Sequence, residues 1–433
     1  MDIQELYQIY LKHPFVCTDS RDVPIESLFF ALKGDRFDGN KYAEAALKSG
    51  AAYAVIDNPE YKKGEQYILV EDSLVYLQQL AHHHRNQFKI PVIGITGSNG
   101  KTTTKELMTS VLTSSYPTHA TKGNFNNHIG VPLTLLAMPL DTEVAIIEMG
   151  MNHLGEIAEL CKIANPTHGL ITNIGKAHLE GVGSLEGVKK AKSELYDYLK
   201  AHNGLIFVNR DERFLWELVG SNHRKKLSYS QTEELAEHYI YQVELLDSKV
   251  FVNARFKNDS GQSININSQL IGTYNFNNMM TAIVIGQYFK VSPLKIKAAI
   301  ENYIPSNNRS QVVQQGSNTF ILDAYNANPT SMQNALEYFK TYPAKKKIAI
   351  LGDMLELGEE SSREHQTIIN QAEKSDLQQV ILVGECFGQC NFNGLYFKSI
   401  NELKTWYDQQ KFEQTAFLIK GSRGIRLEQL LKE

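Results

Sequence analysis

The feature that most constrains this chain is an apolar strand that runs into a glycine-containing turn and then into a helix. The strand is expected over residues 91–95, and Lys101 and Thr102 open the helix. Gly97 and Gly100 let the backbone N–H groups of the turn approach an anion closely. The lysine amine and the threonine hydroxyl then stand where they can reach outer phosphates and a Mg²⁺ ion. The segment predicts a phosphate-binding loop.

The loop is a variant of the strict phosphate-loop pattern, because Ile95 stands where that pattern has its first glycine. The alternative interpretation is an ordinary strand–turn–helix junction. We favour phosphate binding because the lysine, the hydroxyls and both flanking elements are in register.

Length and charge limit the class of protein. A chain of 433 residues is too long for one hydrophobic core, so several domains are expected. The net charge of −4 gives no support to binding of nucleic acid or of a membrane surface. The N-terminus has no apolar run of signal-peptide type, and no segment approaches the length of a membrane span. We expect a cytoplasmic monomer that does not insert into membranes.

The four cysteines do not suggest a disulfide framework in a chain of this length. Cys386 and Cys390 are four residues apart, but no second pair of ligands accompanies them. A structural thiol pair is therefore favoured over a metal site.

Apolar runs that alternate with helical patterns predict an α/β protein of three domains. Residues 1–89 form a small α/β domain, and residues 90–309 form a central nucleotide-binding domain with a parallel sheet. Strict alternation over residues 238–271 predicts an antiparallel hairpin added to that sheet. Residues 310–433 predict a second doubly wound sheet, with functional loops at the carboxyl ends of its strands.

Three residues of the central domain are candidates for chemistry. Glu148 ends a buried strand, where a nucleotide-binding sheet places a Mg²⁺-ligating carboxylate, although a helix cap or ion pair is the alternative. His178 is compatible with a metal ligand, a phosphate contact or a cap. Lys192 lies on a predicted helix, where the plainer interpretation is a solvated face with an ion pair between Lys190 and Glu194.

Residues at the start of the third domain are candidates for nucleotide contacts. Asp323 closes a strand and begins a run rich in Asn and Pro, which is a turn by composition but also offers polar groups to a ligand. Arg309 stands at the expected domain hinge, within reach of a phosphate. Residues 420–424 form a basic, glycine-containing loop suited to a carboxylate or phosphate.

Taken together, these segments resemble the Mur ligase family, whose members form amide bonds with ATP to build the peptide stem of bacterial peptidoglycan. The family's loop TGxxGKT corresponds to residues 96–102, and the resemblance spans the whole chain. Its further motifs are the runs at residues 19–21, 29–39, 123–134, 148–152, 272–278, 323–329 and 351–358.

The resemblance implies a role for each matching residue. ATP is contacted by Thr96, Gly97, Ser98, Asn99, Gly100, Lys101, Thr102, Thr103, Asn275, Asn278, Arg309 and Asp323. Metal ligands at two Mg²⁺ sites are Thr102, Glu148, His178 and Lys192, and Lys192 is expected to be carbamylated. Catalytic residues are Lys101, His178 and Lys192. Ser20 and Arg21 contact a UDP-linked substrate in the first domain, and Asn126, Asn127, Asn326 and Asn328 contact peptide substrate.

The implied reaction is addition of D-alanyl-D-alanine to UDP-N-acetylmuramoyl-tripeptide through an acyl phosphate. The expected partners are these small molecules. A sister ligase that adds a diamino acid or D-glutamate is the nearest alternative. A P-loop hydrolase or transport ATPase and a non-catalytic relative are alternatives from other classes. Two residues depart from the family pattern, His128 where many relatives have Glu, and Ala324 where an acidic or hydroxyl residue is common.

Overall fold

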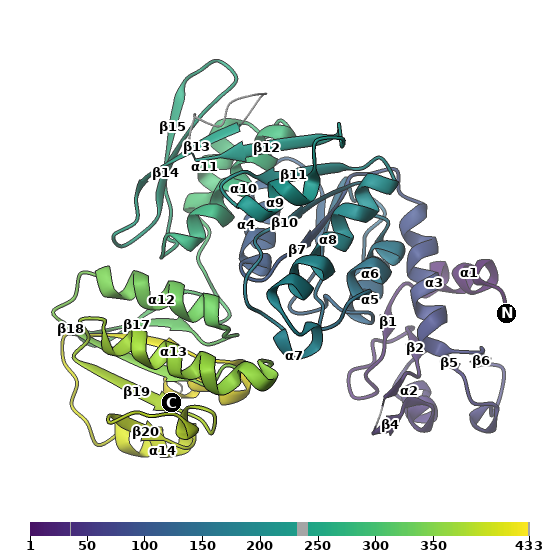
Figure 1. Cartoon of the computed structure of the whole chain (residues 1–433). Helices are drawn as coiled ribbons and strands as arrows, with labels where there is room; N and C mark the ends of the chain where they lie inside the picture. Colours follow the sequence, from purple (N-terminus) through teal and green to yellow (C-terminus); the bar gives the residue numbers. More distant parts are fainter. Residues whose placement is uncertain (35, 232–240, 432–433) are drawn as a thin grey trace.

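The structure, a computed structural model, describes residues 1–34, 36–231 and 241–431, which form three α/β units (Figure 1). Each unit is built on its own mainly parallel sheet, and the N-terminal and C-terminal units lie on either side of the central one. The predicted α/β class is therefore confirmed. In the part of the chain that is described, no helix combines the length and apolar character needed to cross a membrane.

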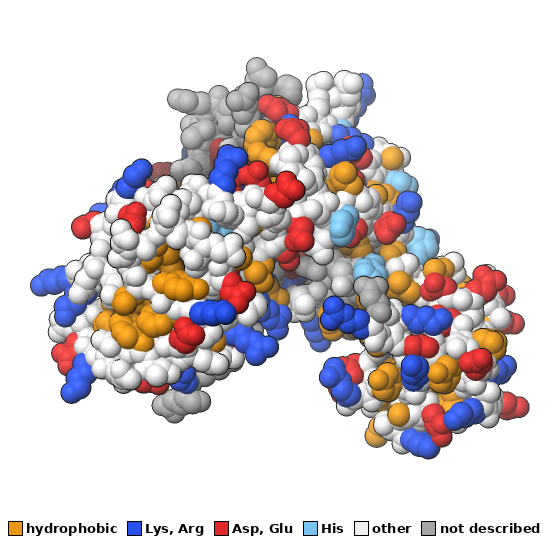
Figure 2. Space-filling model, turned by 60° about the horizontal axis from the view of Figure 1, so that its bottom comes forward, with side chains coloured by type: hydrophobic (Ala, Val, Ile, Leu, Met, Phe, Trp, Pro, Cys, Tyr) orange, Lys and Arg blue, Asp and Glu red, His pale blue; other side chains and the backbone are white. Residues whose placement is uncertain are grey.

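The N-terminal unit has a four-stranded parallel sheet in the order β1-β2-β5-β6. Its strands are β1 Val16–Cys17, β2 Leu28–Phe30, β5 Tyr53–Ile56 and β6 Tyr67–Leu69, and its helices are α1 Ile3–Lys12, α2 Ala43–Lys48 and α3 Ser73–Asn86. A small antiparallel pair, β3 Lys33–Gly34 and β4 Phe37–Asp38, falls in the predicted run 29–39, of which residue 35 is outside the described residues. Figure 2 shows this unit as a separate lobe, set off by a notch whose walls carry several Lys and Arg side chains.

The central unit has a nine-stranded sheet in the order β15-β14-β13-β12-β11-β10-β7-β9-β8. Its strands are β7 Val92–Thr96, β8 Thr118–Ala120, β9 Val144–Glu148, β10 His168–Ile171, β11 Leu205–Asn209, β12 Lys226–Ser230, β13 Tyr241–Asp247, β14 Asn253–Lys257 and β15 Ser263–Asn267. Its helices are α4 Lys101–Thr113, α5 Gly130–Leu136, α6 Glu156–Ala164, α7 Leu179–Val182, α8 Leu185–Ala201, α9 Arg213–Val219, α10 Tyr274–Tyr288 and α11 Pro293–Glu301.

The parallel part of this sheet is buried on both faces, which explains its nearly continuous apolar strands. Successive side chains of a strand point to opposite faces, so Ile93 and Ile95 of β7 join the core under α4, α10 and α11. Val92 joins the core that contains α5, α6 and α8. This sandwich fixes the carboxyl ends of β7, β9 and β10 at one edge, where the polar residues predicted to act gather.

The antiparallel addition to the sheet predicted over residues 238–271 is confirmed, and it is longer than a single hairpin. Antiparallel pairing is present, but it joins three strands, β13, β14 and β15, and β13 also pairs in parallel with β12. Residues 250–252 were expected in a strand and instead lie between β13 and β14. Residues 238–240 of the prediction lie outside the described residues.

The C-terminal unit has a six-stranded sheet in the order β16-β17-β21-β18-β19-β20, with only β16 antiparallel to its neighbour among the described strands. The strands are β16 Gln311–Gln315, β17 Asn318–Asp323, β18 Lys346–Gly352, β19 Gln379–Val383, β20 Leu395–Phe397 and β21 Thr415–Lys420, and the helices are α12 Pro329–Thr341, α13 Ser361–Glu373 and α14 Ile400–Tyr407. The second doubly wound sheet predicted for residues 310–433 is therefore present.

Specific polar contacts join the units. Tyr10 in α1 donates its hydroxyl to the Leu136 carbonyl of the central unit at 2.6 Å. On the other side, Lys176 Nζ lies 2.6 Å from Glu364 Oε1 in α13 of the C-terminal unit. The loops after β7, β9 and β10 therefore face the C-terminal unit across a shared polar cavity.

Candidate active site

The turn after β7 has the backbone expected of a phosphate loop. Gly97 and Gly100 have φ angles of 149° and 79°, in the region that favours glycine. A Cβ atom at Gly97 would overlap the Thr172 hydroxyl, and one at Gly100 would overlap the side chain of Asn278. Glycine is required at both positions for space as well as for conformation.

The segment after β10 holds this loop in place. The Thr172 hydroxyl donates to the carbonyl of Asn99 at 2.6 Å, and Asn173 accepts from the Asn99 N–H at 3.0 Å. Ser98 donates its hydroxyl to the Gly175 carbonyl at 2.9 Å. The loop is therefore preorganised before any ligand enters, which lowers the entropic cost of binding.

Lys101 is folded back over the loop, where its Nζ donates to the Gly97 carbonyl at 2.7 Å. Burial is the main cause that lowers the pKa of Lys101; the carboxylate of Glu148 and, more weakly, that of Glu356 oppose it, while Arg309 acts in the same direction as burial. Two cations that disfavour each other at one end of a cavity form a site that an anion would stabilise.

Glu148, at the end of β9, meets the start of α4 as predicted. Its Oε1 accepts hydrogen bonds from the Thr102 hydroxyl at 3.2 Å and from Asn126 Nδ2 at 2.9 Å. Its Oε2 lies 3.5 Å from Lys105 Nζ, an ion pair that sequence reasoning missed, and has no hydrogen-bond donor among the described residues. A buried carboxylate oxygen without a donor fits a cation ligand, beside the Thr102 hydroxyl.

Lys192 is fully buried in α8, so the interpretation as part of a solvated face is wrong. Its Nζ has no hydrogen-bond partner in the described part of the chain, and burial, followed by repulsion from Lys101, holds its pKa well below the ordinary value. Glu194 is occupied elsewhere, since its carboxylate accepts the N–H groups of Gly155 and Ala158 at the start of α6. A buried amine with a lowered pKa and no structural partner is typical of a functional lysine.

His178 lies in the left-handed region with φ of 54° at the start of α7. Its Nδ1 lies 2.7 Å from Glu356 Oε2, so a residue of the C-terminal unit reaches the central unit. Nδ1 has no hydrogen-bond partner among the described residues, so the contact is one of distance and charge, and it is the main reason why the pKa of Glu356 is lowered.

Asn275 and Asn278 form a buried network at the start of α10. Asn278 donates to Asn275 Oδ1 at 2.8 Å and accepts from the Thr104 hydroxyl at 3.0 Å, and Asn275 donates to the carbonyl of Ile271 at 2.8 Å. Their side chains therefore brace the phosphate loop through α4 and Gly100, a structural role that sequence reasoning did not expect.

Residues at and near the carboxyl ends of the C-terminal strands form another side of the site. Asp323 accepts from Lys420 Nζ at 2.6 Å and from the Ser310 N–H at 3.1 Å. The Arg309 guanidinium stacks 3.6 Å from the centre of the Tyr325 ring. Such stacking holds a guanidinium in place while leaving its N–H groups available to an anion.

The asparagines predicted to contact peptide have local partners as well. Asn328 caps α12 and donates its Nδ2 to Asn99 Oδ1 of the phosphate loop at 2.8 Å. Asn127 Oδ1 accepts the N–H groups of Ile129 and Gly130, and Asn326 Oδ1 accepts that of Ala327.

One cavity of about 610 Å³ collects most of the predicted site. The predicted residues that line it are Ser98, Asn99, Gly100, Lys101, Thr102, Thr103, Asn126, Asn127, Glu148, His178, Asn275, Asn278, Arg309, Asp323, Asn326 and Asn328. Thr96, Gly97 and Lys192 are not part of its lining but are adjacent in the structure to residues that are. His128 lines it, while Ala324 is buried.

Ser20 and Arg21 do not join this cavity, since they belong to the N-terminal unit, where Arg21 is engaged with Asp19 at 2.6 Å. Sequence reasoning also missed several lining residues, namely Tyr274, Ser310, Tyr325 and Glu356, while Lys420, from the predicted basic loop, does line the cavity. Tyr325 and Glu356 lie inside runs that had been singled out as motifs, so the signal was present without an assigned role.

Family models match three consecutive stretches of the chain. The Mur ligase family, catalytic domain matches residues 13–85, the Mur ligase middle domain matches residues 95–286, and the Mur ligase, glutamate ligase domain matches residues 308–391.

Curated relatives agree with the family models along nearly the whole chain. A UDP-N-acetylmuramoyl-tripeptide–D-alanyl-D-alanine ligase of Bacillus subtilis (strain 168) is 34% identical over 440 residues, covering 96% of this chain and 92% of the relative. The protein of the same name from Escherichia coli (strain K12) is 32% identical, with 96% and 92% covered.

Solved structures agree as well. MurF from Acinetobacter baumannii superposes with a TM-score of 0.84 at 29% identity, covering 99% of this chain and 97% of that one. MurF ligase from Thermotoga maritima in complex with ADP gives a TM-score of 0.84 at 26% identity, with 98% and 97% covered. With this similarity in sequence and structure, the chain belongs to the Mur ligase family.

Proposed function

We propose that this protein joins D-alanyl-D-alanine to UDP-N-acetylmuramoyl-tripeptide at the expense of ATP. The observation that carries the proposal is the cavity in which the phosphate loop, the carboxylate of Glu148 and the C-terminal residues Arg309 and Asp323 meet. The curated relatives named for this reaction support the same substrates. The experiment below distinguishes this acceptor from the alternative, a diamino acid.

The chemistry explains why a ligase needs such a cavity. A carboxylate does not acylate an amine at neutral pH, because its leaving group would be an oxide ion. An oxygen of the tripeptide carboxylate therefore attacks the γ-phosphorus of ATP, and ADP leaves with the electron pair of the broken P–O bond. The dipeptide amine then attacks the acyl carbon and phosphate leaves. The first step brings two anions together, so fixed positive charge at the site is required.

Lys101 and Arg309 are the residues we assign to that charge. Lys101 starts α4 at the phosphate loop, and Arg309 is held over the cavity by the ring of Tyr325. The backbone N–H groups between Gly97 and Gly100 supply further donors that need no reorganisation. Asn275 and Asn278 complete the nucleotide side of the cavity.

Thr102, Glu148, His178 and Lys192 are the residues we assign to Mg²⁺. The Oε2 of Glu148, which accepts no hydrogen bond, and the amine of Lys192, which has no partner among the described residues, fit this assignment. A neutral, buried amine is the form that adds CO₂, and the resulting carbamate would place an anion near Lys101 in place of a second amine. When bound, Mg²⁺ would screen the phosphate charge during transfer.

We assign the substrates to different units. Residues 1–89, with Ser20 and Arg21, would bind the UDP-linked peptide, and the basic notch in Figure 2 suits its phosphates. Residues 90–309 would bind ATP. Residues 310–433, with Asn326 and Asn328, would close over ATP and bind the dipeptide. We expect the protein to act as a monomer.

The test is ADP release from purified protein with ATP, Mg²⁺ and UDP-N-acetylmuramoyl-tripeptide. We expect release only when D-alanyl-D-alanine is added, and no release from the Lys101→Ala variant. Release with a single diamino acid on the matching dipeptide substrate would favour the sister ligase. Release without any acceptor would favour a hydrolase, and normal turnover by Lys101→Ala would contradict the nucleotide site.

A further inference from the structure

Glu356 belongs to the run 351–358, which the sequence singled out but which no step of the proposed reaction uses. It follows β18 in the C-terminal unit, yet its carboxylate lies 2.7 Å from Nδ1 of His178 in the central unit. Both residues line the large cavity. A second contact runs parallel to the first, since the Glu180 N–H donates to the Glu356 carbonyl at 3.2 Å.

The turn that leads to Glu356 is held at the backbone N–H groups of residues 353–355. The Asp353 N–H donates to the carbonyl of Val383 at 3.0 Å. The N–H of Met354 donates to His365 Nε2 at 3.0 Å, and that of Leu355 donates to the Ser422 hydroxyl at 3.0 Å. A turn fixed by three separate segments presents its last side chain in one direction.

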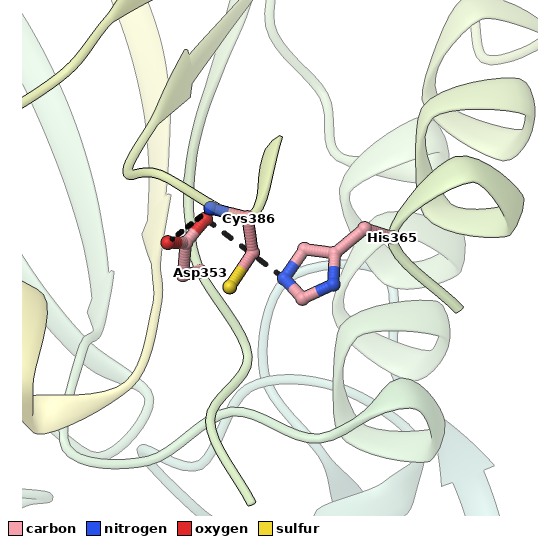
Figure 3. Close-up of side chains that lie close together, drawn as sticks. All are labelled: Asp353, His365 and Cys386. Atoms are coloured by element: carbon pink, nitrogen blue, oxygen red, sulfur yellow. Dashed lines mark hydrogen bonds and ion pairs between the residues drawn. The ribbon is translucent and has the colours of Figure 1, made fainter. Parts of the chain in front are cut away.

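A buried cluster of Asp353, His365 and Cys386 supplies part of that support (Figure 3). The cluster has the composition of a metal site, but its Asp353 and His365 atoms already make hydrogen bonds. The two carboxylate oxygens of Asp353 accept the N–H groups of Cys386 and Phe387, each at 2.9 Å. His365 donates from Nδ1 to the Ser361 carbonyl at 2.7 Å, so its Nε2 carries no proton and accepts from Met354. The cluster is a scaffold for the turn.

The backbone at both ends of the Glu356–His178 contact is unusual. His178 has φ of 54° and Glu356 has φ of 64°, values that residues with a side chain adopt rarely. Strained residues of this kind persist where the surroundings over-determine them, often at functional sites. Here the two strained residues face each other across the boundary between two units.

We propose that Glu356 is a positioning residue for His178, whose ring it holds through the 2.7 Å contact with Nδ1 only while the C-terminal unit is docked, so that Nδ1–H turns toward this carboxylate. A carboxylate that accepts from Nδ1–H leaves Nε2 as the lone-pair nitrogen of the ring. The inference rests on the proposed ligase function. It gives the otherwise unused run 351–358 a task, which is to complete the cavity of the neighbouring unit.

The kinetic test compares Glu356→Gln and Glu356→Ala with Glu359→Ala, an exposed glutamate of the same segment. Removing the carboxylate partner of a functional histidine costs about 10–100-fold. We therefore expect kcat of Glu356→Ala to fall by that factor while KM for the dipeptide is unchanged. Glu356→Gln, which keeps an acceptor oxygen, should recover part of kcat, and Glu359→Ala should match the wild type.

A measurement without substrates separates positioning from folding. In full-length protein labelled with ¹⁵N-histidine and free of nucleotide, the His178 Nδ1–H proton should give a downfield resonance, identified by its loss in His178→Gln. We expect it to persist in Glu359→Ala, to shift in Glu356→Gln and to vanish in Glu356→Ala.

The outcomes distinguish this inference from the proposed function. An active wild-type enzyme whose Glu356→Ala and Glu359→Ala variants have equal kcat would overturn the inference alone. So would a wild-type protein without the His178 resonance. If the wild type does not release ADP with any acceptor, the function fails, while the resonance still reports on the contact. If Glu356→Ala does not fold, the isosteric Glu356→Gln variant tests the inference. Its His178 resonance should be shifted and its kcat should be lower than that of the wild type, and an unchanged resonance with an unchanged kcat would overturn the inference.

Discussion

At the scale of single residues, Lys192 shows how a functional group can oppose stability. Its amine is fully buried without a partner, and its pKa is far below the ordinary value. The unfolded chain therefore binds a proton at this amine more readily than the folded chain does, so this residue favours unfolding as the pH falls below the ordinary lysine pKa. Proteins retain such residues at functional sites despite the loss of stability.

Lys192→Met should consequently stabilise the protein while it abolishes ADP formation. Methionine fills similar volume without a polar atom, and a buried unsatisfied group costs about 1–3 kcal/mol. We expect the free energy of unfolding of the nucleotide-free protein in urea at pH 7 to rise by about that amount. Lys190→Met, at an exposed position of the same helix, should change neither quantity. A destabilised Lys192→Met variant that still releases ADP would mean that the lysine is structural.

The helical period contained a signal for Lys192 that the interpretation of a solvated face overlooked. Val188, Ala191 and Leu195 are buried, and their spacing places Lys192 on the same face of α8. Roles that depend on a second unit, such as those of Glu356 and Tyr325, had no comparable signal. Their partners are distant in sequence, and no local pattern encodes which segments meet across a cavity.

At the scale of elements, the start of α10 braces the phosphate loop. Asn278 links Asn275 and Thr104 and fills the space beside Gly100. Asn278→Ala should therefore leave buried polar groups unpaired and loosen the loop, at a cost of about 1–3 kcal/mol in stability. We expect a lower thermal midpoint and a higher KM for ATP. The matched control is Asn277→Ala, which changes the same residue type on the same helix. Equal thermal midpoints and equal KM values for the two variants would contradict the structural role of Asn278.

The longer strands were predictable from sequence because short, continuous apolar runs, such as residues 144–147 and 348–351, are typical of buried strands. The short strands β8 and β20 and the edge strand β16 were not. β8 and β20 have three residues each and are only partly buried, so they carry no apolar run. Their strand character comes from pairing with a longer neighbour, which is a tertiary effect.

At the scale of the whole molecule, the cavity exists only where the C-terminal unit docks on the loops after β7 and β10. Lys176 and Glu364 join the two units at 2.6 Å, and the Glu364 side chain is 3% exposed while that of Lys176 is 41% exposed. The buried carboxylate depends on this lysine, because an unpaired buried charge is far more costly than an exposed pair is stabilising. The ion pair should therefore bias the units toward the docked arrangement.

Reversing these charges tests that bias. Lys176→Glu places two carboxylates together, and we expect the nucleotide-free protein to show a larger radius of gyration in small-angle X-ray scattering and slower ADP release. Glu364→Lys should behave in the same way, since it brings two amines together. In the double variant the attraction is restored, so both quantities should return toward the wild-type values, with a coupling of about 0.5–3 kcal/mol in kcat/KM. If instead the two single changes are additive, the pair does not control docking, and the contacts of Asn328 and Glu356 carry it.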